Sequence, residues 1–148
     1  MRFWKMHGAG NDFVLVDDRS RGFPAGDREW IAAIAARRTG IGCEGIILIQ
    51  GSRRADFRMR FFNPDGGEVE MCGNGARCVA RLARDIGVAP DEMTIETCAG
   101  RLRAGIEGSL VRLYMTDPKD WRLNRSLTAG RRKIAYGFVN SGVPHAVV

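Results

Sequence analysis

The chain has 148 residues, of which 45% are hydrophobic and 27% charged, with a formal net charge of +6 at pH 7. This composition is typical of a globular protein and excludes a mainly disordered chain, because the apolar side chains can offset the entropy lost on ordering. No apolar run approaches the ~18 residues of a membrane span, and the opening MRFWKMHGAGNDF lacks the apolar core of a secretory signal. These features predict a cytoplasmic protein without a membrane partner.

Most of the positive charge lies in one segment, Lys119 to Lys133, which holds six basic residues against Asp120. The rest of the chain is nearly neutral, so the sequence indicates no broad phosphate-binding face and predicts no nucleic-acid partner. We interpret the basic segment as a solvated connection, and Trp121 within it as a packing anchor rather than a base-stacking residue.

Periodicity and turn residues predict a series of short elements. The short run GIILIQ at 45–50 is apolar up to its final glutamine, which is typical of a strand buried on both faces, whereas apolar and basic residues alternate over 57–61 as in a half-buried strand. Pro64-Asp65-Gly66-Gly67 has the residues of a turn. The expected elements are strands over 1–6 and 12–17, a helix capped by Asp27 and running to about Arg38, strands over 45–50, 55–63 and 68–71, a helix over 74–86, and strands over 93–98, 101–106, 110–115, 134–139 and from 145 onward.

The four cysteines are Cys43, Cys72, Cys78 and Cys98. We expect free thiols, because disulfides are rare in cytoplasmic proteins. The closest two are six residues apart and the chain has only two histidines, so neither the cysteine spacing nor a histidine cluster predicts a metal site. Cys78 lies near the apolar stripe of the expected helix, and Cys43 and Cys98 have no neighbouring base or acid, so these three are interpreted as structural.

Cys72 stands where a strand is expected to end and Gly73-Asn74-Gly75 to open a helix. This arrangement places the thiol near free backbone N–H groups and the positive end of the helix dipole, which favours a thiolate. The same N–H groups can bind a carboxylate. Cys72 is therefore a candidate base or nucleophile beside an anion site, although a small buried residue ahead of a glycine turn also fits the pattern.

Four segments together resemble the diaminopimelate epimerases: KMHGAGNDFVLVDD at 5–18, TGIGCEGIILI at 39–49, FFNPDGGEVEMCGNGARC at 61–78 and SGVPHAVV at 141–148. The resemblance covers essentially the whole chain. It implies an α+β fold, in which a curved, mostly antiparallel sheet wraps around a central helix, here 74–86. It also implies an isomerase of lysine and peptidoglycan precursor synthesis, which converts LL- to meso-diaminopimelate without a cofactor. In the mechanism that the resemblance implies, two cysteines on opposite sides of the α-carbon remove and return its proton.

The resemblance also implies roles for single residues. Cys72 corresponds to one of the two catalytic cysteines, and His145 to a histidine that tunes the pKa values of the thiols. Two positions depart from the family, since Val143 stands where an asparagine is frequent and Gly45 where some members have glutamine. The substrate-binding positions of the family fall on Asn11, Asn63, Gly73 and Asn74.

The domain organisation follows from Asp117-Pro118, which ends one run of strands. We expect an N-terminal epimerase domain over 1–118 and the start of a second, incomplete domain of the same fold over 119–148. The family's second catalytic cysteine lies in that second domain, so the missing C-terminal domain is an expected partner and the chain alone is expected to be inactive. A homodimer is compatible with the sequence. Two other readings stay open: a proline-type racemase or isomerase, and a non-catalytic domain that binds an anion or amino acid.

Overall fold

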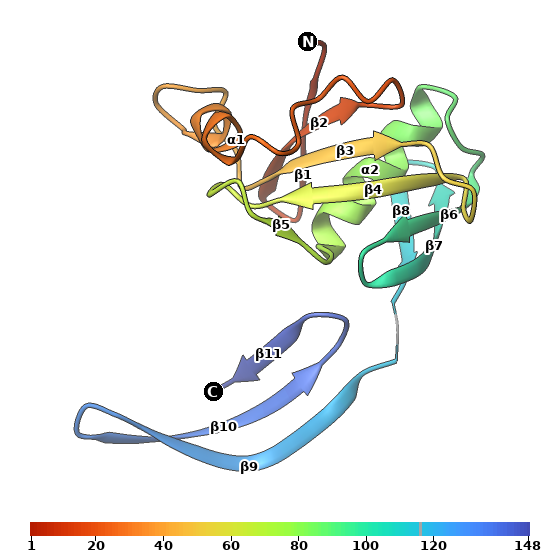
Figure 1. The fold of residues 1–148 in the computed structure, drawn as a ribbon. Helices are drawn as coiled ribbons and strands as arrows, with labels where there is room; N and C mark the ends of the chain where they lie inside the picture. Colours follow the sequence, from red (N-terminus) through yellow and green to blue (C-terminus); the bar gives the residue numbers. More distant parts are fainter. Residues whose placement is uncertain (116) are drawn as a thin grey trace. The chain divides into compact units, whose positions relative to one another are not determined.

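A computed structural model describes residues 1–115 and 117–148, in two units that comprise Met1–Tyr114 and Met115–Val148. The strands of the first unit are β1 (Trp4–Gly8), β2 (Asn11–Asp17), β3 (Ile46–Gln50), β4 (Phe57–Phe62), β5 (Glu68–Val69), β6 (Glu92–Thr97), β7 (Gly100–Glu107) and β8 (Leu110–Tyr114). Its helices are α1 (Arg28–Ala35) and α2 (Gly73–Asp85). The strands form one sheet in the order β1-β2-β3-β4-β6-β7-β8, with β5 paired to β4 (Figure 1).

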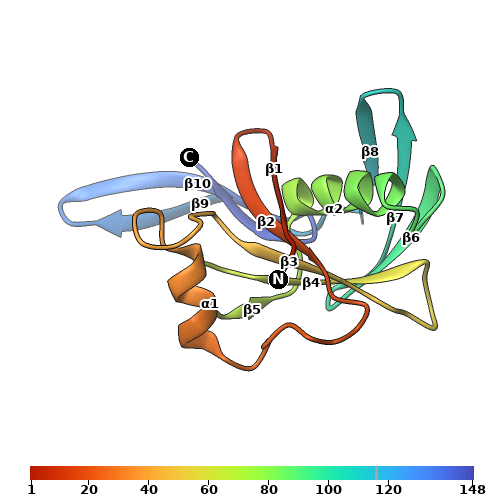
Figure 2. The ribbon, with the colours of Figure 1, turned by 90° about the horizontal axis from the view of Figure 1, so that it is seen from above.

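The sheet of the first unit is mostly antiparallel, with parallel pairing only at β2–β3 and β4–β6 among the described strands. It curves around α2, which packs against β1, β2, β3, β4, β7 and β8. Figure 2 shows α2 between the β1–β2 hairpin on one side and β7 and β8 on the other. The predicted α+β fold, with a curved sheet around a central helix, is confirmed.

The two helices also explain why β3 is buried at every position. All five residues of this strand are buried. Ile47 lies on the side of α2, whereas Ile46 and Leu48 belong to a second cluster that contains Ile31 of α1. A strand with a helix over each face has no polar side, as the sequence predicted.

Helix α1 begins where the sequence predicted and ends earlier. The Asp27 side chain caps it by accepting a hydrogen bond at 2.9 Å from a backbone N–H of the first turn. The helix stops at Ala35 rather than Arg38, because the backbone of Ala36 is extended. The chain then folds back, and the Cys43 N–H donates to the Ala35 carbonyl at 3.0 Å.

Among the described residues, neither helix has the length and apolar character needed to cross a membrane.

The second unit is a three-stranded antiparallel sheet of β9 (Lys119–Ala129), β10 (Arg132–Asn140) and β11 (Pro144–Val147), in the order β11-β10-β9. The interpretation of the basic segment as a connection is therefore wrong. The alternation of β9 is hidden in the sequence because Asp120 and Asn124 have positive φ and the pairing with β10 shifts register twice. The assignment of 119–148 to a second domain of the same fold stays a prediction.

Trp121 was expected to be a packing anchor, and this interpretation is also wrong for the described chain. Its side chain is 62% exposed on β9. Its indole N–H donates to the Pro118 carbonyl at 3.2 Å. The ring is therefore held by a local hydrogen bond while most of its surface faces solvent.

Candidate functional site

The start of α2 has the geometry that the sequence predicted, and the helix agrees with the expected 74–86 within one residue at each end. Cys72 is its N-cap, with an extended backbone at φ −139° and ψ 119°, and its thiol makes no capping hydrogen bond. The Cys72 carbonyl accepts the Ala76 N–H at 2.7 Å. The N–H groups of the three residues between them therefore have no acceptor within the helix, and they directly follow a half-buried cysteine in the chain.

The β1–β2 hairpin approaches this helix start closely at Gly8. A Cβ atom on Gly8 would lie 2.7 Å from the Asn74 carbonyl oxygen and 3.3 Å from the Cys78 sulfur. The glycine is thus required for the close packing of β1 on the first turn of α2. This contact brings Asn11, at the start of β2, next to Asn74.

Two of the predicted site residues are joined by a hydrogen bond. The Asn74 side-chain amide donates through Nδ2 to Oδ1 of Asn11. Asn11 in turn donates through its Nδ2 to Oε2 of Glu44, and Arg77 donates through Nη2 to Oδ1 of Asn74. The structure therefore places two amides and two charged side chains in one chain of contacts beside Cys72.

The other predicted residues take different places. Asn63 opens the turn between β4 and β5, where its N–H donates to the Gly67 carbonyl at 2.8 Å and its carbonyl accepts the Gly66 N–H at 2.9 Å. Among the described residues its side chain has no hydrogen bond that links it to the Asn11–Asn74 pair. His145 is exposed on β11 of the second unit, opposite Val139, and its role stays a prediction.

The sequence did not predict that Glu44 and Arg77 form hydrogen bonds with Asn11 and Asn74. Both lie inside the segments quoted above, in TGIGCEGIILI and in CGNGARC. The available signal was a single charged residue within an otherwise apolar or glycine-rich motif. Neither spacing nor periodicity indicates that these two side chains reach the same asparagine pair.

The four cysteines are free thiols in unequal surroundings. Cys43 and Cys78 are buried, and burial raises the pKa of each of these thiols above its ordinary value. Cys98 is exposed, with its sulfur 3.8 Å from Oε1 of Glu68. Across residues 1–115 and 117–148, no group of three or more His, Cys, Asp or Glu side chains is placed to hold a metal ion.

A charged cluster is centred on Asp12, the residue that follows Asn11. The Asp12 carboxylate lies 2.7 Å from the guanidinium of Arg37 and 2.7 Å from the ammonium of Lys5. Hydrogen bonds from Arg37 and then from Lys5 hold the pKa of this carboxyl well below its usual range. The cluster joins β1 and β2 to the segment that follows α1.

Substitution of Asp12 by asparagine is expected to lower the unfolding free energy at pH 7 by about 1 kcal/mol, since the cations are partly exposed and solvent screens the pairs. Because the folded pKa is depressed, this stabilisation is present above the unfolded pKa and is lost as pH falls below about 4. Urea unfolding of both proteins between pH 7 and pH 3 measures the difference, with Asp85→Asn as the surface control. A difference that stays constant or grows in acid would contradict this account.

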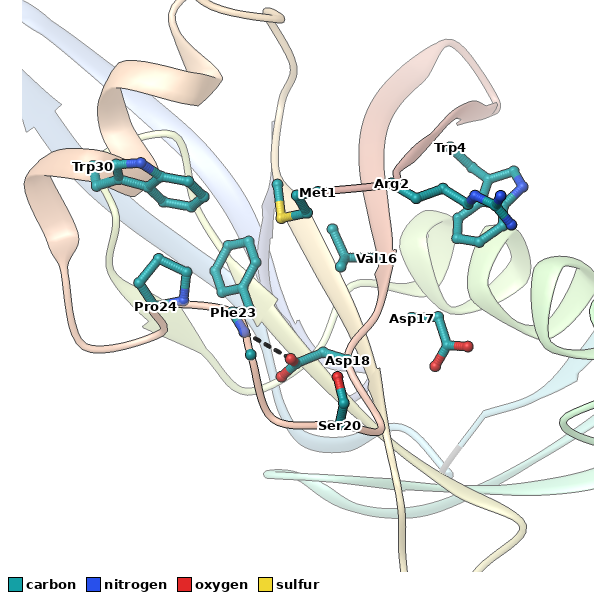
Figure 3. A pocket seen from close by; sticks show the side chains of 11 residues that line it. Met1, Arg2, Trp4, Val16, Asp17, Asp18, Ser20, Phe23, Pro24 and Trp30 are labelled. Carbon is teal, nitrogen blue, oxygen red and sulfur yellow. Dashed lines mark hydrogen bonds between the residues drawn. The ribbon is translucent and has the colours of Figure 1, made fainter.

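The first unit also has a pocket of about 570 Å³, whose lining is drawn in Figure 3. It includes Val16 and Asp17, at the end of β2 that is far from Asn11. Phe23 and Trp30 form part of its wall, with ring centroids 5.2 Å apart. Asp18 is 2% exposed, and its carboxylate accepts the Phe23 N–H at 2.8 Å and the Gln50 amide at 2.7 Å. Its acidic group is thus engaged in holding the loop after β2, and none of the predicted site residues lines this pocket.

Comparison with known proteins gives one family. Residues 3–121 match the family described as diaminopimelate epimerase. Two relatives with that name, from Desulforudis audaxviator and Aquifex aeolicus, are 40% and 36% identical over 165 and 159 aligned residues. Each alignment covers 100% of this chain, but only 59% and 57% of the relative. The chain thus spans less than two thirds of the length of these relatives.

Solved structures give the same fold. A probable proline racemase from Agrobacterium radiobacter superposes with a TM-score of 0.72 at 19% identity, over 97% of this chain and 50% of that chain. A hydroxyproline epimerase from Agrobacterium vitis superposes with a TM-score of 0.69 at 18% identity, with the same coverage. At these identities the likeness concerns the fold alone.

Proposed function

Because the chain belongs to the diaminopimelate epimerase family, we propose that it carries one half of a cofactor-independent amino-acid epimerase that converts LL- to meso-diaminopimelate. The observation that carries this proposal is the position of Cys72 at the N-cap of α2, beside backbone N–H groups without an acceptor in the helix. The contact between Asn11 and Asn74 adds side-chain amides to the same place.

The α-proton of an amino acid is weakly acidic, so its removal requires stabilisation of the negative charge that develops. In the proposed mechanism the substrate carboxylate binds at the start of α2, where N–H groups and the helix dipole stabilise that charge. The Cys72 thiolate then takes the α-proton: the C–H bond breaks, an S–H bond forms, and the electron pair moves into the carboxylate.

Inversion requires a second acid on the opposite face of the α-carbon. We propose that a further C-terminal domain supplies this group as a thiol, which donates its proton to the carbanion. The shorter length of this chain relative to its relatives supports the proposal. The chain by itself is then expected to lack epimerase activity.

The proposal is tested by fusing the chain to the part of the Desulforudis audaxviator relative that lies beyond the aligned region. In D₂O, the fusion is expected to replace the α-proton of LL-diaminopimelate with deuterium and to form the meso isomer, as followed by NMR. The chain alone should do neither. Conversion by the isolated chain at an enzyme-like rate would show that the two-cysteine mechanism is wrong.

Thiol reactivity can be measured on the chain itself. Cys72 is expected to react with iodoacetamide at neutral pH several times faster than the exposed Cys98, because the free N–H groups at the helix start stabilise negative charge on the attacking sulfur. Cys43 and Cys78 should be slower still, because burial restricts access and raises their pKa. Mass spectrometry of peptides from the chain and from Cys98→Ser gives the separate rates. Equal rates at Cys72 and Cys98 would favour a non-catalytic binding domain.

A further inference from the structure

We propose that Glu44 and Arg77 are positioning residues, which fix the direction of the Asn11 and Asn74 amide groups so that each keeps one N–H for a substrate carboxylate. This inference rests on the proposed function and assigns a role to two side chains outside the predicted site. It depends on the order of donors and acceptors along the contact chain, which runs from Arg77 through Asn74 and Asn11 to Glu44.

The charged residues at the two ends of this contact chain determine the direction of its hydrogen bonds. An asparagine side chain can be turned by 180° with little change in shape, so its own packing rarely decides which atom faces a neighbour. An arginine guanidinium, however, can only donate hydrogen bonds, and a carboxylate can only accept them. Arg77 therefore requires the oxygen of Asn74 to face it, and Glu44 requires the nitrogen of Asn11.

The central contact is consistent with both requirements. With its oxygen on Arg77, Asn74 can offer only its nitrogen to Asn11, and with its nitrogen on Glu44, Asn11 can offer only its oxygen to Asn74. The observed bond has this sense. If either end loses its charged group, the asparagine next to it can turn over, and the contact between the two amides is no longer determined.

Glu44 is itself held in place from two sides. Its backbone N–H donates to the Asp12 carbonyl at 2.8 Å, and its Oε1 lies 3.4 Å from Nη2 of Arg37. Arg77 stands in the first turns of α2, on the same rigid element as Asn74. The positioning groups thus come from a loop anchored to β2 and from the helix, and both fix the amides before a ligand arrives.

These hydrogen-bond directions leave a site that is rich in hydrogen-bond donors. Each Nδ2 carries two hydrogens, and within the described residues each donates only one of them to the protein. One N–H on Asn11 and one on Asn74 are left, beside the backbone N–H groups of the α2 start. This set of donors suits a carboxylate, whereas turned amides would present oxygen atoms that repel it.

The first test uses the side-chain amide NMR signals of the ¹⁵N-labelled chain. Arg77→Met is expected to shift the signals of Asn74 and also those of Asn11, because the loss of one end frees both amides. Arg81→Met is the matched control, since Arg81 lies one turn later on α2 and donates to the Gly108 carbonyl at 2.6 Å. If Arg77→Met leaves the Asn11 amide as unchanged as Arg81→Met does, the positioning role is wrong.

The second test uses the fusion described above. At Arg77 and at Glu44, it compares a variant that removes the charged group with a conservative replacement. Arg77→Met and Glu44→Leu are expected to lower kcat/KM by about 10- to 100-fold, a typical cost of misplaced binding groups. Arg77→Lys keeps a group that can only donate, and Glu44→Asp keeps a carboxylate that can only accept, so both should retain activity within about threefold of the parent. Equal losses in the conservative and non-conservative variants would overturn the proposal.

The two tests distinguish a failure of the proposed function from a failure of the positioning role. If the amide signals respond to Arg77→Met but the fusion shows no α-proton exchange, the positioning role stands and the proposed function fails. If the fusion is active and Arg77→Met moves neither the Asn11 signals nor kcat/KM, the function stands and the positioning role fails. Urea unfolding of each variant shows that the protein stays folded.

Discussion

Replacement of Cys72 by alanine in the fused protein is expected to lower the rate of α-proton exchange by about 10²- to 10⁴-fold, the range that a positioned acid–base group contributes. The thiolate at the N-cap of α2 is the only base that the proposed mechanism places on this face of the substrate. Alanine keeps the small volume and the extended backbone of Cys72 but has no proton acceptor. The rate is measured by NMR in D₂O with LL-diaminopimelate.

The matched control for this variant is Cys98→Ala, which removes an exposed thiol from the same domain and should leave the exchange rate unchanged. Urea unfolding of both variants separates a loss of chemistry from a loss of fold. A Cys72→Ala protein that is folded and keeps more than a tenth of the parent rate would exclude Cys72 as the base.

Replacement of Gly45 by glutamine is expected to lower the unfolding free energy by about 3 kcal/mol, at the upper end of the usual cost of overpacking. A Cβ atom at this position would lie 2.2 Å from Cε2 of the Phe61 ring and 3.0 Å from the Phe62 carbonyl oxygen. Phe61 is itself buried and packs edge-on against Phe13, with ring centroids 6.0 Å apart. The ring therefore has little room to move away.

The control for this variant is Gly51→Gln, because a Cβ atom at Gly51 meets no other atom within 4 Å. Urea unfolding at pH 7 should show a large loss for Gly45→Gln and a small one for Gly51→Gln. The double variant Gly45→Gln with Phe61→Ala should lose less than the two separate losses combined, because the smaller residue removes the clash. Equal stability of the Gly45→Gln protein and the parent would refute the packing argument.

This packing also accounts for one departure from the family in physical terms. A glutamine at position 45, as in some family members, has no space here while Phe61 keeps its place. With glycine at this position, the chain has no side chain there that could contact a ligand. The other departure, Val143, lies in the second unit between β10 and β11.

Local signals account for the features that could be predicted from the sequence. Asp27 and the glycines after Cys72 mark helix starts, and the alternation over 57–61 marks a half-buried strand, because these patterns depend on neighbours in the chain. The position of Cys72 in the turn before this helix was predicted for the same reason, and the structure makes Cys72 the N-cap. A candidate site at a helix start is thus visible in the sequence before any tertiary contact is known.

Contacts between distant segments account for what could not be predicted. The hydrogen bond between Asn74 and Asn11 joins residues 63 positions apart, and no periodicity encodes it. The early end of α1 depends on the return of Cys43 to the Ala35 carbonyl, which is a tertiary contact. In β9, the irregular residues Asp120 and Asn124 interrupt the alternation by which a strand is recognised.

The exposure of β9 has a consequence for the behaviour of the chain in solution. All 11 residues of this strand are exposed, and it forms one edge of the β11-β10-β9 sheet. An exposed edge with apolar residues such as Trp121 and Leu123 is a template for pairing with another chain, and basic side chains along it oppose such pairing by mutual repulsion. Salt screens this repulsion, so the chain should associate with itself more readily as the ionic strength rises. The basic residues of β9 thus oppose aggregation at this edge of the sheet.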